Sequence, residues 1–516
     1  MTVPIADPAS LGRRLERYRS GARTGPITDA ARQVELPHGP IDRHVLADRL
    51  ARTLGGEVIG SPAGSYVLCE SQSRAIPLDR ERLARLPAQP APGVPLVCLD
   101  TETTGLATAA GTVAFLIGLG WWRGDRFHQV QLLLPDHADE PAMLTALARH
   151  IPVDGWLVTY NGRGFDWPLL VTRYRMARRA APVHGGHLDL LPIVRRLFRH
   201  RLDDARLRTA EAGLLGLHRH GDIDGSEIPA RYLGFLRGGP AAPLAEVARH
   251  NDQDVRSLAR LLVLLATDYG TTEARRSAPA GDLGGLARAY AREGRLAEAL
   301  ECYDVAFSAD PGATPPSIGM PSPPDARRAP GASGELPWWS PNVPPDFGGR
   351  QPPAIQPAAS VRSAAFATPW TSERIAIERA QTLRRLRRWD AAAEAWASLA
   401  AGPGRSAIVA AIELAKLREH RLRDPSGALR ATGEGLALVE RRRRLGRPEP
   451  RLEADLRGRA RRLRRRIAAR AGRQAAPPTS GTRGSSASPA QRPRTSSSSG
   501  SNEQAIVRRS PVSALR

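Results

Sequence analysis

The sequence predicts an α/β domain, a mixed sheet with flanking helices, followed by an all-α helical-repeat domain and a disordered basic tail. Three observations indicate this organisation. Between residues 96 and 266, apolar strand-like runs give way to segments of helical spacing that alternate with a strand. After residue 280 a helix–turn–helix pattern of small and aromatic residues begins. Residues 441–516 carry 21 arginines against four acidic residues, so +17 of the formal charge of +23 lies there.

The length and the cysteine content bound the class of protein. A chain of 516 residues is too long for one ordinary core, so two or three domains are expected. Cys69, Cys98 and Cys302 lie far apart and form no CxxC pair, which fits a reducing cytoplasm. The N-terminus lacks the apolar core of a signal peptide, and the longest apolar helical stretch, 258–266, is too short to span a bilayer. A cytoplasmic protein without membrane spans is expected.

A single lysine, Lys416, narrows the possible chemistry. Its surroundings have helical spacing and no glycine loop precedes it. A Walker A loop, a kinase strand lysine or a Schiff-base lysine would each need a lysine elsewhere. The sequence therefore argues against a P-loop or kinase-type nucleotide enzyme. The preference for arginine also reflects GC-rich coding, which weakens the inference from basic charge alone.

Residues 1–90 are expected to form an N-terminal extension with a short hairpin. Helical spacing occurs near 10–20 and at 42–54, and residues 55–70 indicate two strands around a Ser-Pro-Ala-Gly turn. A proline-rich stretch at 86–95 marks the boundary of the next domain.

Residues 91–268 are expected to form the α/β domain. The predicted strands are 96–100, 112–122, 128–135 and 155–161. The predicted helices are 140–151, 165–179 and a long final helix at 243–266, with the segment 187–198 before it.

Residues 280–439 are expected to form tetratricopeptide-like helical repeats. In the first copy, two short helices joined at Gly294 place small or aromatic residues at offsets of the 34-residue repeat: Leu286, Ala287, Tyr290, Ala299, Tyr303 and Ala306, before Pro311. A weaker copy lies 93 residues further on, where Leu383, Ala392 and Trp396 take the places of Tyr290, Ala299 and Tyr303. A third helical pair is expected at 407–439. A plain helical bundle is the alternative.

Two segments are expected to be disordered because of their composition. Residues 312–370, which interrupt the repeats, are rich in Pro, Gly and Ser. The tail at 440–516 begins with arginine clusters up to residue 472, which could be helical but are not clearly amphipathic, and continues as a Ser/Gly/Pro/Arg-rich segment.

A pair of carboxylates follows the first strand of the α/β domain. In LVCLDTETTG, residues 96–105, Asp100 and Glu102 are two residues apart, so both can point to one side of the strand. Converging carboxylates repel each other unless protons or cations neutralise them. Carboxylate oxygens suit Mg²⁺ or Mn²⁺. The sequence indicates half of a metal site, although two carboxylates on a solvent-exposed turn would give the same pattern.

Two further motifs supply polar side chains to the same domain. Asp166, in YNGRGFDWPLL, follows a strand and opens a helix at the sheet edge, where it could also serve as a plain N-cap. His250 and Asp254, in RHNDQDVRSL, are four residues apart and share one helix face. The alternative for this pair is a polar face that pairs with Arg249 or Arg256.

The order of these motifs resembles the DEDD exonuclease superfamily, whose members have a ribonuclease-H-like fold. Residues 96–266 are more closely similar to the YprB family of ribonuclease-H-like proteins. The segments that carry the resemblance are DTETTGLATAAGTVAFLIGLG, VTYNGRGFDWPLL, HLDLLPIVRRLF and VARHNDQDVRSL. Helical repeats in the C-terminal half are also similar to what such proteins carry.

The resemblance implies a metal-dependent nuclease, a 3′–5′ exonuclease that hydrolyses phosphodiester bonds of DNA or RNA with two Mg²⁺ or Mn²⁺ ions. It implies four metal-binding carboxylates: Asp100, Glu102, Asp166 and Asp254. His250 falls where the family places the residue that orients or deprotonates water; the spacing matches the tyrosine-type branch, but the residue is histidine. Asn161 and Thr103 are the expected substrate contacts.

Two kinds of partner are expected. Nucleic acid would contact the basic tail through its phosphates in a salt-sensitive way, and a protein would bind the helical repeats. The alternative function is a catalytically weak or inactive nucleic-acid-binding scaffold that keeps the fold.

Overall fold

The structure is a computed structural model that describes residues 42–105, 111–308 and 369–475. The helix expected near 10–20, the insertion expected at 312–370 up to residue 368, and the tail beyond 475 lie outside these described residues.

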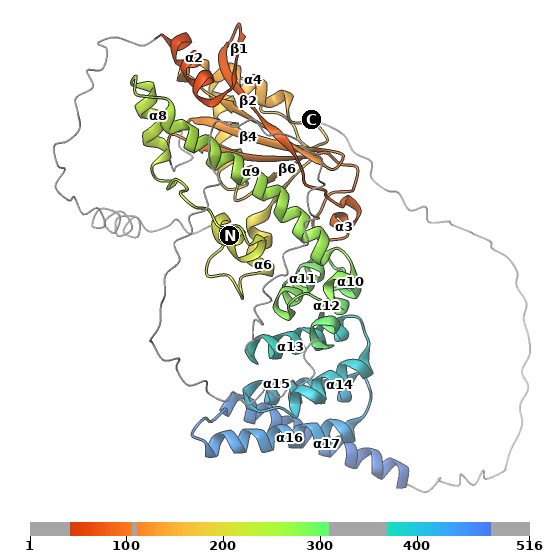
Figure 1. The fold of residues 1–516 in the computed structure, drawn as a ribbon. Helices are drawn as coiled ribbons and strands as arrows, with labels where there is room; N and C mark the ends of the chain where they lie inside the picture. Colours follow the sequence, from red (N-terminus) through yellow and green to blue (C-terminus); the bar gives the residue numbers. More distant parts are fainter. Residues whose placement is uncertain (1–41, 106–110, 309–368, 476–516) are drawn as a thin grey trace, which may run out of the picture.

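A seven-stranded sheet forms the centre of the first domain, with the strand order β1-β2-β5-β4-β3-β6-β7 (Figure 1). Strands β1 to β5 pair antiparallel along this order, whereas β3, β6 and β7 pair parallel. The predicted mixed sheet is confirmed. Its strands are β1 (Glu57–Ser61), β2 (Gly64–Ala75), β3 (Leu96–Thr103), β4 (Ala114–Arg123), β5 (Arg126–Leu133), β6 (Trp156–Thr159) and β7 (Gly186–Asp189).

The hairpin expected within the N-terminal extension at 1–90 pairs with this sheet. β2 runs on to Ala75 and pairs with β5, so the hairpin forms one edge of the sheet. The physical reason is that a two-stranded hairpin is marginal alone in water. Here it buries Tyr66 and Val67 in a core shared with the strands of the main domain.

Helices cover both faces of the sheet, as expected of an α/β layer fold. Alternating side chains of β3 point to opposite faces: Val97 and Leu99 join one core, and Leu96 and Cys98 join the other. The helices are α2 (Arg43–Leu54), α3 (Arg80–Ala84), α4 (Glu140–Arg149), α5 (Asp166–Met176), α6 (Leu190–Leu197), α7 (Leu207–Ala210), α8 (Ile228–Leu236), α9 (Ala242–Tyr269) and α10 (Thr272–Arg275). Helix α9 runs from the sheet toward the C-terminal helices (Figure 1).

The C-terminal region is a stack of helices, as predicted. The predicted repeat positions, including Tyr290, Tyr303 and Trp396, are buried. The tetratricopeptide assignment itself remains a prediction. The helices are α11 (Ala280–Arg292), α12 (Leu296–Ser308), α13 (Pro369–Arg385), α14 (Trp389–Ala400), α15 (Gly404–His420), α16 (Pro425–Arg444) and α17 (Pro450–Ala475).

Part of the expected tail belongs to this stack. The boundary expected at 440 falls inside α16, and the arginine-rich segment continues as α17. Leu456 and Leu463 of α17 are buried, and Leu456 packs in a cluster with Ile408 and Val439. An apolar stripe on one face of α17 therefore packs the helix against the stack. The many arginines around this stripe make it hard to recognise in the sequence.

A glycine in β4 allows α9 to lie close to the sheet. A Cβ built on Gly118 would stand 2.2 Å from Oδ1 of Asn251 and 2.8 Å from Val255, both on α9. Asn251 is fully buried and Val255 is almost so. Neither side chain has room to withdraw, so any residue larger than glycine would push the helix outward.

We predict that Gly118→Ala destabilises the protein by about 1–3 kcal/mol, because overpacking forces α9 away from β4. Urea unfolding measures the change. The matched control is Gly60→Ala in strand β1, where an added Cβ meets nothing within 4 Å, and it should stay within about 0.5 kcal/mol of the wild type. Equal stability of the two variants would contradict the close approach of α9.

Candidate active site

Strand β3 brings Asp100 and Glu102 to one side of the sheet, facing α9. Asp100 is half-buried and Glu102 is buried. Asn251 donates from Nδ2 to Oδ2 of Asp100 at 2.9 Å. Its amide oxygen accepts from Gln131 at 2.9 Å, which fixes the orientation of the amide and aims its donor at Asp100. The pairing between β3 and β4 shifts between Glu102 and Thr103, directly after the two carboxylates.

The structure places Asp166 next to the same strand. Asp166 is the first residue of α5, and the N-cap position before it is occupied by Phe165. Oδ1 of Asp166 accepts a hydrogen bond from Thr101 of β3 at 2.5 Å. Asp166 is buried. Its side chain is therefore linked directly to the central strand.

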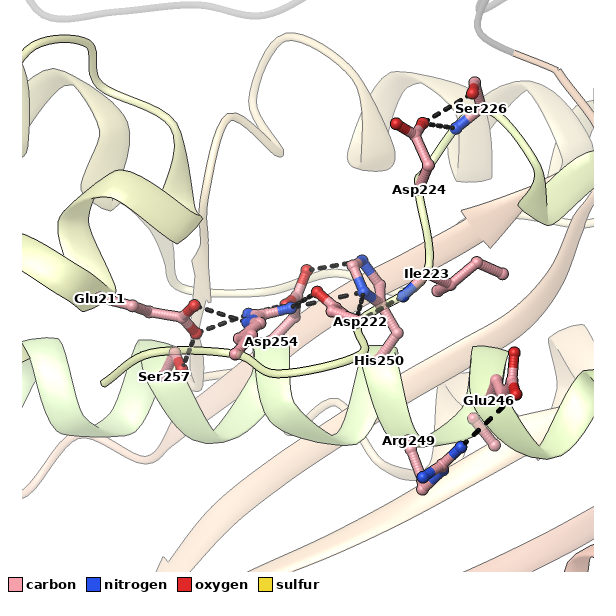
Figure 2. Close-up of polar contacts among 12 residues, drawn as sticks. Glu211, Asp222, Ile223, Asp224, Ser226, Glu246, Arg249, His250, Asp254 and Ser257 are labelled. Carbon is pink, nitrogen blue, oxygen red and sulfur yellow. Dashed lines mark hydrogen bonds and ion pairs between the residues drawn. The ribbon is translucent and has the colours of Figure 1, made fainter. Parts of the chain in front are cut away.

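Asp254 and His250 lie about one turn apart on the same face of α9, as their spacing predicts. Both contact the loop before α8 (Figure 2). His250 Nδ1 lies 2.8 Å from Oδ1 of Asp222, and its Nε2 lies 3.7 Å from Oδ2 of Asp254. Arg219 donates to Oδ1 of Asp254 in a short contact.

Arg219 is the centre of an ion-pair network behind these two residues. It forms a bidentate pair with Glu211 at 2.5 and 2.6 Å, and it contacts Asp222 at 3.1 Å. Glu211 is fully buried and also accepts from Ser257 of α9 (Figure 2). Two planar groups matched in this way form a strong, directional interaction. The network fixes the loop at 217–223 against α9.

Burial raises the pKa of all four carboxylates, and nearby acidic groups add to this effect. The pKa of Asp100 is raised well above its usual value by burial and then by the charges of Asp254 and Glu102. The pKa of Glu102 is also raised, by burial and by Asp254 and Asp166. Burial raises the pKa of Asp166 to about 6, against the Thr101 hydrogen bond. Burial raises the pKa of Asp254 as well, against the charge of Arg219.

These shifts set the direction of the pH dependence of stability. A carboxyl whose pKa is raised in the folded state holds a disfavoured charge at neutral pH. For Asp166, folding becomes more favourable as the pH falls from about 6 to the ordinary value of 3.8, because the native state takes up its proton first. The metal-free centre therefore reduces stability at neutral pH, and a bound cation would remove that effect.

Glu102 is the carboxylate without a hydrogen-bond donor in the described residues, although the charge of Arg219 acts to lower its pKa. Asp100 accepts a hydrogen bond from Asn251, and Asp166 accepts one from Thr101. Asp254 accepts one from Arg219. Within the described ranges the Glu102 carboxylate accepts none, although the residue is buried with 8% of its surface exposed. A largely buried carboxylate without a protein donor is stabilised by a proton, a cation or the remaining solvent contact.

The side chains of this centre therefore have the charge that a metal ion needs, but their arrangement does not form a complete metal site. The donor set is all carboxylate oxygen, as Mg²⁺ and Mn²⁺ prefer. In the part of the chain that the structure describes, however, no group of three or more His, Cys, Asp or Glu side chains is arranged so that it could hold a metal ion. The Arg219 guanidinium lies against one oxygen of Asp254. A cation shared with Asp254 would compete with Arg219 for that carboxylate.

The two expected substrate contacts differ in their exposure. Asn161 is exposed and has a positive φ of 70°, in the turn between β6 and α5, a conformation that asparagine adopts more readily than most residues. Its backbone N–H donates to Asp189, the cap of α6, at 2.8 Å. Thr103 is buried, and its hydroxyl donates to the carbonyl of Gly105 at 2.7 Å.

A basic cleft of about 310 Å³ adjoins His250. Arg219, Asp222 and His250 line it together with residues further along α9, among them Arg256 and Arg260. The wall of the cleft is mainly cationic, and none of the four carboxylates lines it.

Four important residues were not predicted as parts of the site: Asn251, Thr101, Arg219 and Glu211. Asn251 lies inside the HNDQD motif, and its burial on the face of α9 beside Asp254 is the signal that could have identified it. Arg219 and Glu211 lie in a loop and a short π-helix without a periodic pattern. Only the fold brings them to Asp254.

Two comparisons with known proteins agree with this geometry. Residues 97–266 match the family model described as the RNase_H superfamily. A stretch of 170 residues is 38% identical to a Bacillus subtilis (strain 168) protein named "Uncharacterized protein YprB". The match covers 33% of this chain and 41% of that relative, so the chain spans less than half of the relative's length.

Residues 97–266 are thus a ribonuclease H superfamily domain, as the predicted fold class required. The similarity to YprB agrees with the family resemblance expected from the motifs. The family model ends at residue 266, before the helical stack. Among the described helices, none has the length and apolar character needed to cross a lipid bilayer.

We predict that Arg219→Gln costs about 3–5 kcal/mol of stability, because it leaves the fully buried Glu211 without its cation. The double variant Glu211→Gln/Arg219→Gln should recover most of this loss, since two amides carry no buried charge. Chemical unfolding of both variants measures the difference.

The control for this prediction is Arg249→Gln, which removes an exposed arginine 3.9 Å from Glu246 on the same helix. It should change stability by less than about 1 kcal/mol. An Arg219→Gln variant as stable as Arg249→Gln would show that the network does not hold the loop.

Proposed function

We propose that this chain is a divalent-metal-dependent nuclease that hydrolyses phosphodiester bonds of DNA or RNA, acting as a 3′–5′ exonuclease. The observation that supports this most is the carboxylate pair on β3. Glu102 lacks any hydrogen-bond donor in the described residues, and desolvation and neighbouring carboxylates raise the pKa of Asp100. A domain of the ribonuclease H superfamily around that pair supports the same chemistry.

In this proposal Asp100, Glu102, Asp166 and Asp254 would hold two Mg²⁺ or Mn²⁺ ions. When bound, such ions supply charge for activating water and for stabilising the leaving oxygen. Asn251 keeps Asp100 oriented, and Thr101 keeps Asp166 beside β3. These two donors act as positioning residues, because they touch the carboxylates and not the substrate.

His250 is the proposed proton acceptor. Its Nδ1 is closest to a carboxylate of Asp222, which can only accept, and this contact assigns the proton to Nδ1. The Nε2 atom is then the basic nitrogen, on the side of Asp254. A neutral imidazole oriented in this way can act as a general base toward a water molecule.

The substrate would approach over the rim and the cationic cleft. Asn161 is exposed next to the start of α5, where its side chain can meet a phosphate. Thr103 belongs to the same proposal, although its hydroxyl is already held by Gly105. Arginines of the cleft along α9 would attract the phosphate backbone.

A second candidate is a catalytically weak or inactive nucleic-acid-binding scaffold. The ion pair between Arg219 and Asp254 favours it, because an internal cation already neutralises one of the four carboxylates. In that case the helical stack would be the working surface, and a protein partner bound there would direct the molecule.

We predict that end-labelled DNA or RNA is degraded stepwise from the 3′ end with Mg²⁺ or Mn²⁺, and that Asp100→Asn slows this by about 10²-fold or more. Single- and double-stranded substrates of both kinds are tested with and without a chelator. The matched control is Glu57→Gln, an exposed carboxylate of β1, which should leave the rate unchanged.

Metal-dependent cleavage that Asp100→Asn abolishes would support the nuclease. Binding without any metal-dependent cleavage on every substrate would favour the scaffold. Cleavage that persists fully in Asp100→Asn would contradict the proposed centre.

A further inference from the structure

A second cationic groove lies at the junction of the two domains, at the opposite end of α6 from the candidate active site. It has a volume of about 570 Å³ and is formed by α6 on one side and by α11 and α13 on the other. Six arginines line it: Arg195, Arg196, Arg199, Arg288, Arg292 and Arg374. His200 lines it as well, and the lining contains no acidic residue.

Most of this charge is not neutralised from inside the protein. Arg288 and Arg374 share one carboxylate, that of Glu378. Within the described ranges, Arg195, Arg199 and Arg292 form no ion pair, and all three are exposed. Burial and the nearby charge of Arg292 lower the pKa of Arg196. The guanidinium groups therefore repel one another across the groove.

The walls of the groove are held rigidly in spite of this repulsion. A Cβ on Gly285 of α11 would stand 2.5 Å from the carbonyl oxygen of Arg196, so α11 lies directly against the end of α6. Below the groove the fully buried Asp282 accepts two hydrogen bonds from Arg201, at 3.0 and 3.1 Å, and one from Tyr269. A preorganised cationic surface loses little entropy when an anion binds.

The groove and the candidate active site are joined by α6. The cap of α6, Asp189, holds the backbone N–H of Asn161 at the rim of the site. At 1.5 Å per residue, Arg195 lies about 9 Å further along the same helix. Arg195 is also near enough to Tyr160 for its charge to act on that hydroxyl. Phosphates bound in the groove would thus lie within a few nucleotides of Asn161.

We propose that this interdomain groove binds the phosphate backbone of a nucleic acid strand and leads it to the candidate active site. That the strand is led to the active site rests on the proposed nuclease function. That the groove binds the strand rests on the arginines alone. Guanidinium groups match phosphate oxygens in planar, bidentate contacts. The lining offers few apolar side chains, chiefly Pro192 and Ile375, so a protein surface would find little to bury.

The test is a triple charge reversal, Arg195→Glu/Arg199→Glu/Arg292→Glu, in the full chain. Binding of a labelled single strand of about 20 nucleotides is measured by anisotropy in the presence of a chelator, across a series of salt concentrations. We expect the affinity at low salt to fall about tenfold or more, and the slope of log K against log salt to decrease by about 2, from three lost contacts on a single strand.

The matched control reverses three exposed arginines that lie on helices of the opposite face, Arg52→Glu/Arg149→Glu/Arg175→Glu. The control carries the same change in net charge, and circular dichroism melting compares the stability of both variants. If the control weakens binding as much as the groove variant, only the net charge matters and the proposal is wrong. Unchanged binding by the groove variant also overturns it.

A separate arm distinguishes a strand from a small anion. Suppose that inorganic tripolyphosphate binds the wild type but not the groove variant, while the strand binds both equally. The groove would then be a site for a free polyphosphate, and the proposal would be wrong. Because binding is measured without metal, it is independent of catalysis. If the groove binds the strand but Asp100→Asn cleaves like the wild type, the proposed groove is supported and the proposed nuclease centre is wrong.

Discussion

The compensation of negative charge beside β3 is the constraint on which the rest of the domain depends. Four carboxylates from β3, α5 and α9 have a raised pKa, chiefly because burial excludes much of the water around them and also because of nearby acidic groups. The chain supplies donors to three of them, through Asn251, Thr101 and Arg219. Glu102 is left without one among the described residues. The folded protein therefore bears an electrostatic cost at neutral pH, which a cation would relieve, and such costs are typical of functional centres.

The framework around these carboxylates is built to keep them in place. Gly118 lets α9 approach the sheet, and this approach sets Asn251 between Gln131 and Asp100 in a row across three strands. Arg219 and the buried Glu211 fix the loop on the other side of α9. Arg219 has two opposed effects: it stabilises the loop, and it competes with any cation for Asp254. Asp254 can take part in a metal site only if it binds a cation in place of the Arg219 guanidinium.

The sequence predicted the general fold and the site-bearing segments because both leave local patterns. The apolar runs and helical spacings of residues 96–266 identified the mixed sheet and its helices, and the superfamily match agrees. A hairpin was expected at 55–70, but the extension of its second strand to residue 75 and its pairing with β5 depend on long-range contacts that no local pattern records. Helix α17 was missed as part of the stack because its arginines obscure the stripe through Leu456 and Leu463. Arg219 and Glu211 could not be predicted, since an ion pair between two irregular segments has no periodic signal. The roles of Asp100, Glu102, Asp166, His250 and Asp254 stay predictions.

The most direct test of the account is the effect of Mn²⁺ on thermal unfolding at pH 7.5, in the wild type and in Glu102→Gln. The account predicts that the variant is more stable than the wild type without metal, because it carries no buried charge at this position. It also predicts that saturating Mn²⁺ stabilises the wild type, by about 2.7 kcal/mol at a hundredfold excess over Kd, and the variant much less. A Glu102→Gln variant that is no more stable than the wild type without metal, and that Mn²⁺ stabilises equally, would contradict the assignment of these carboxylates to a cation.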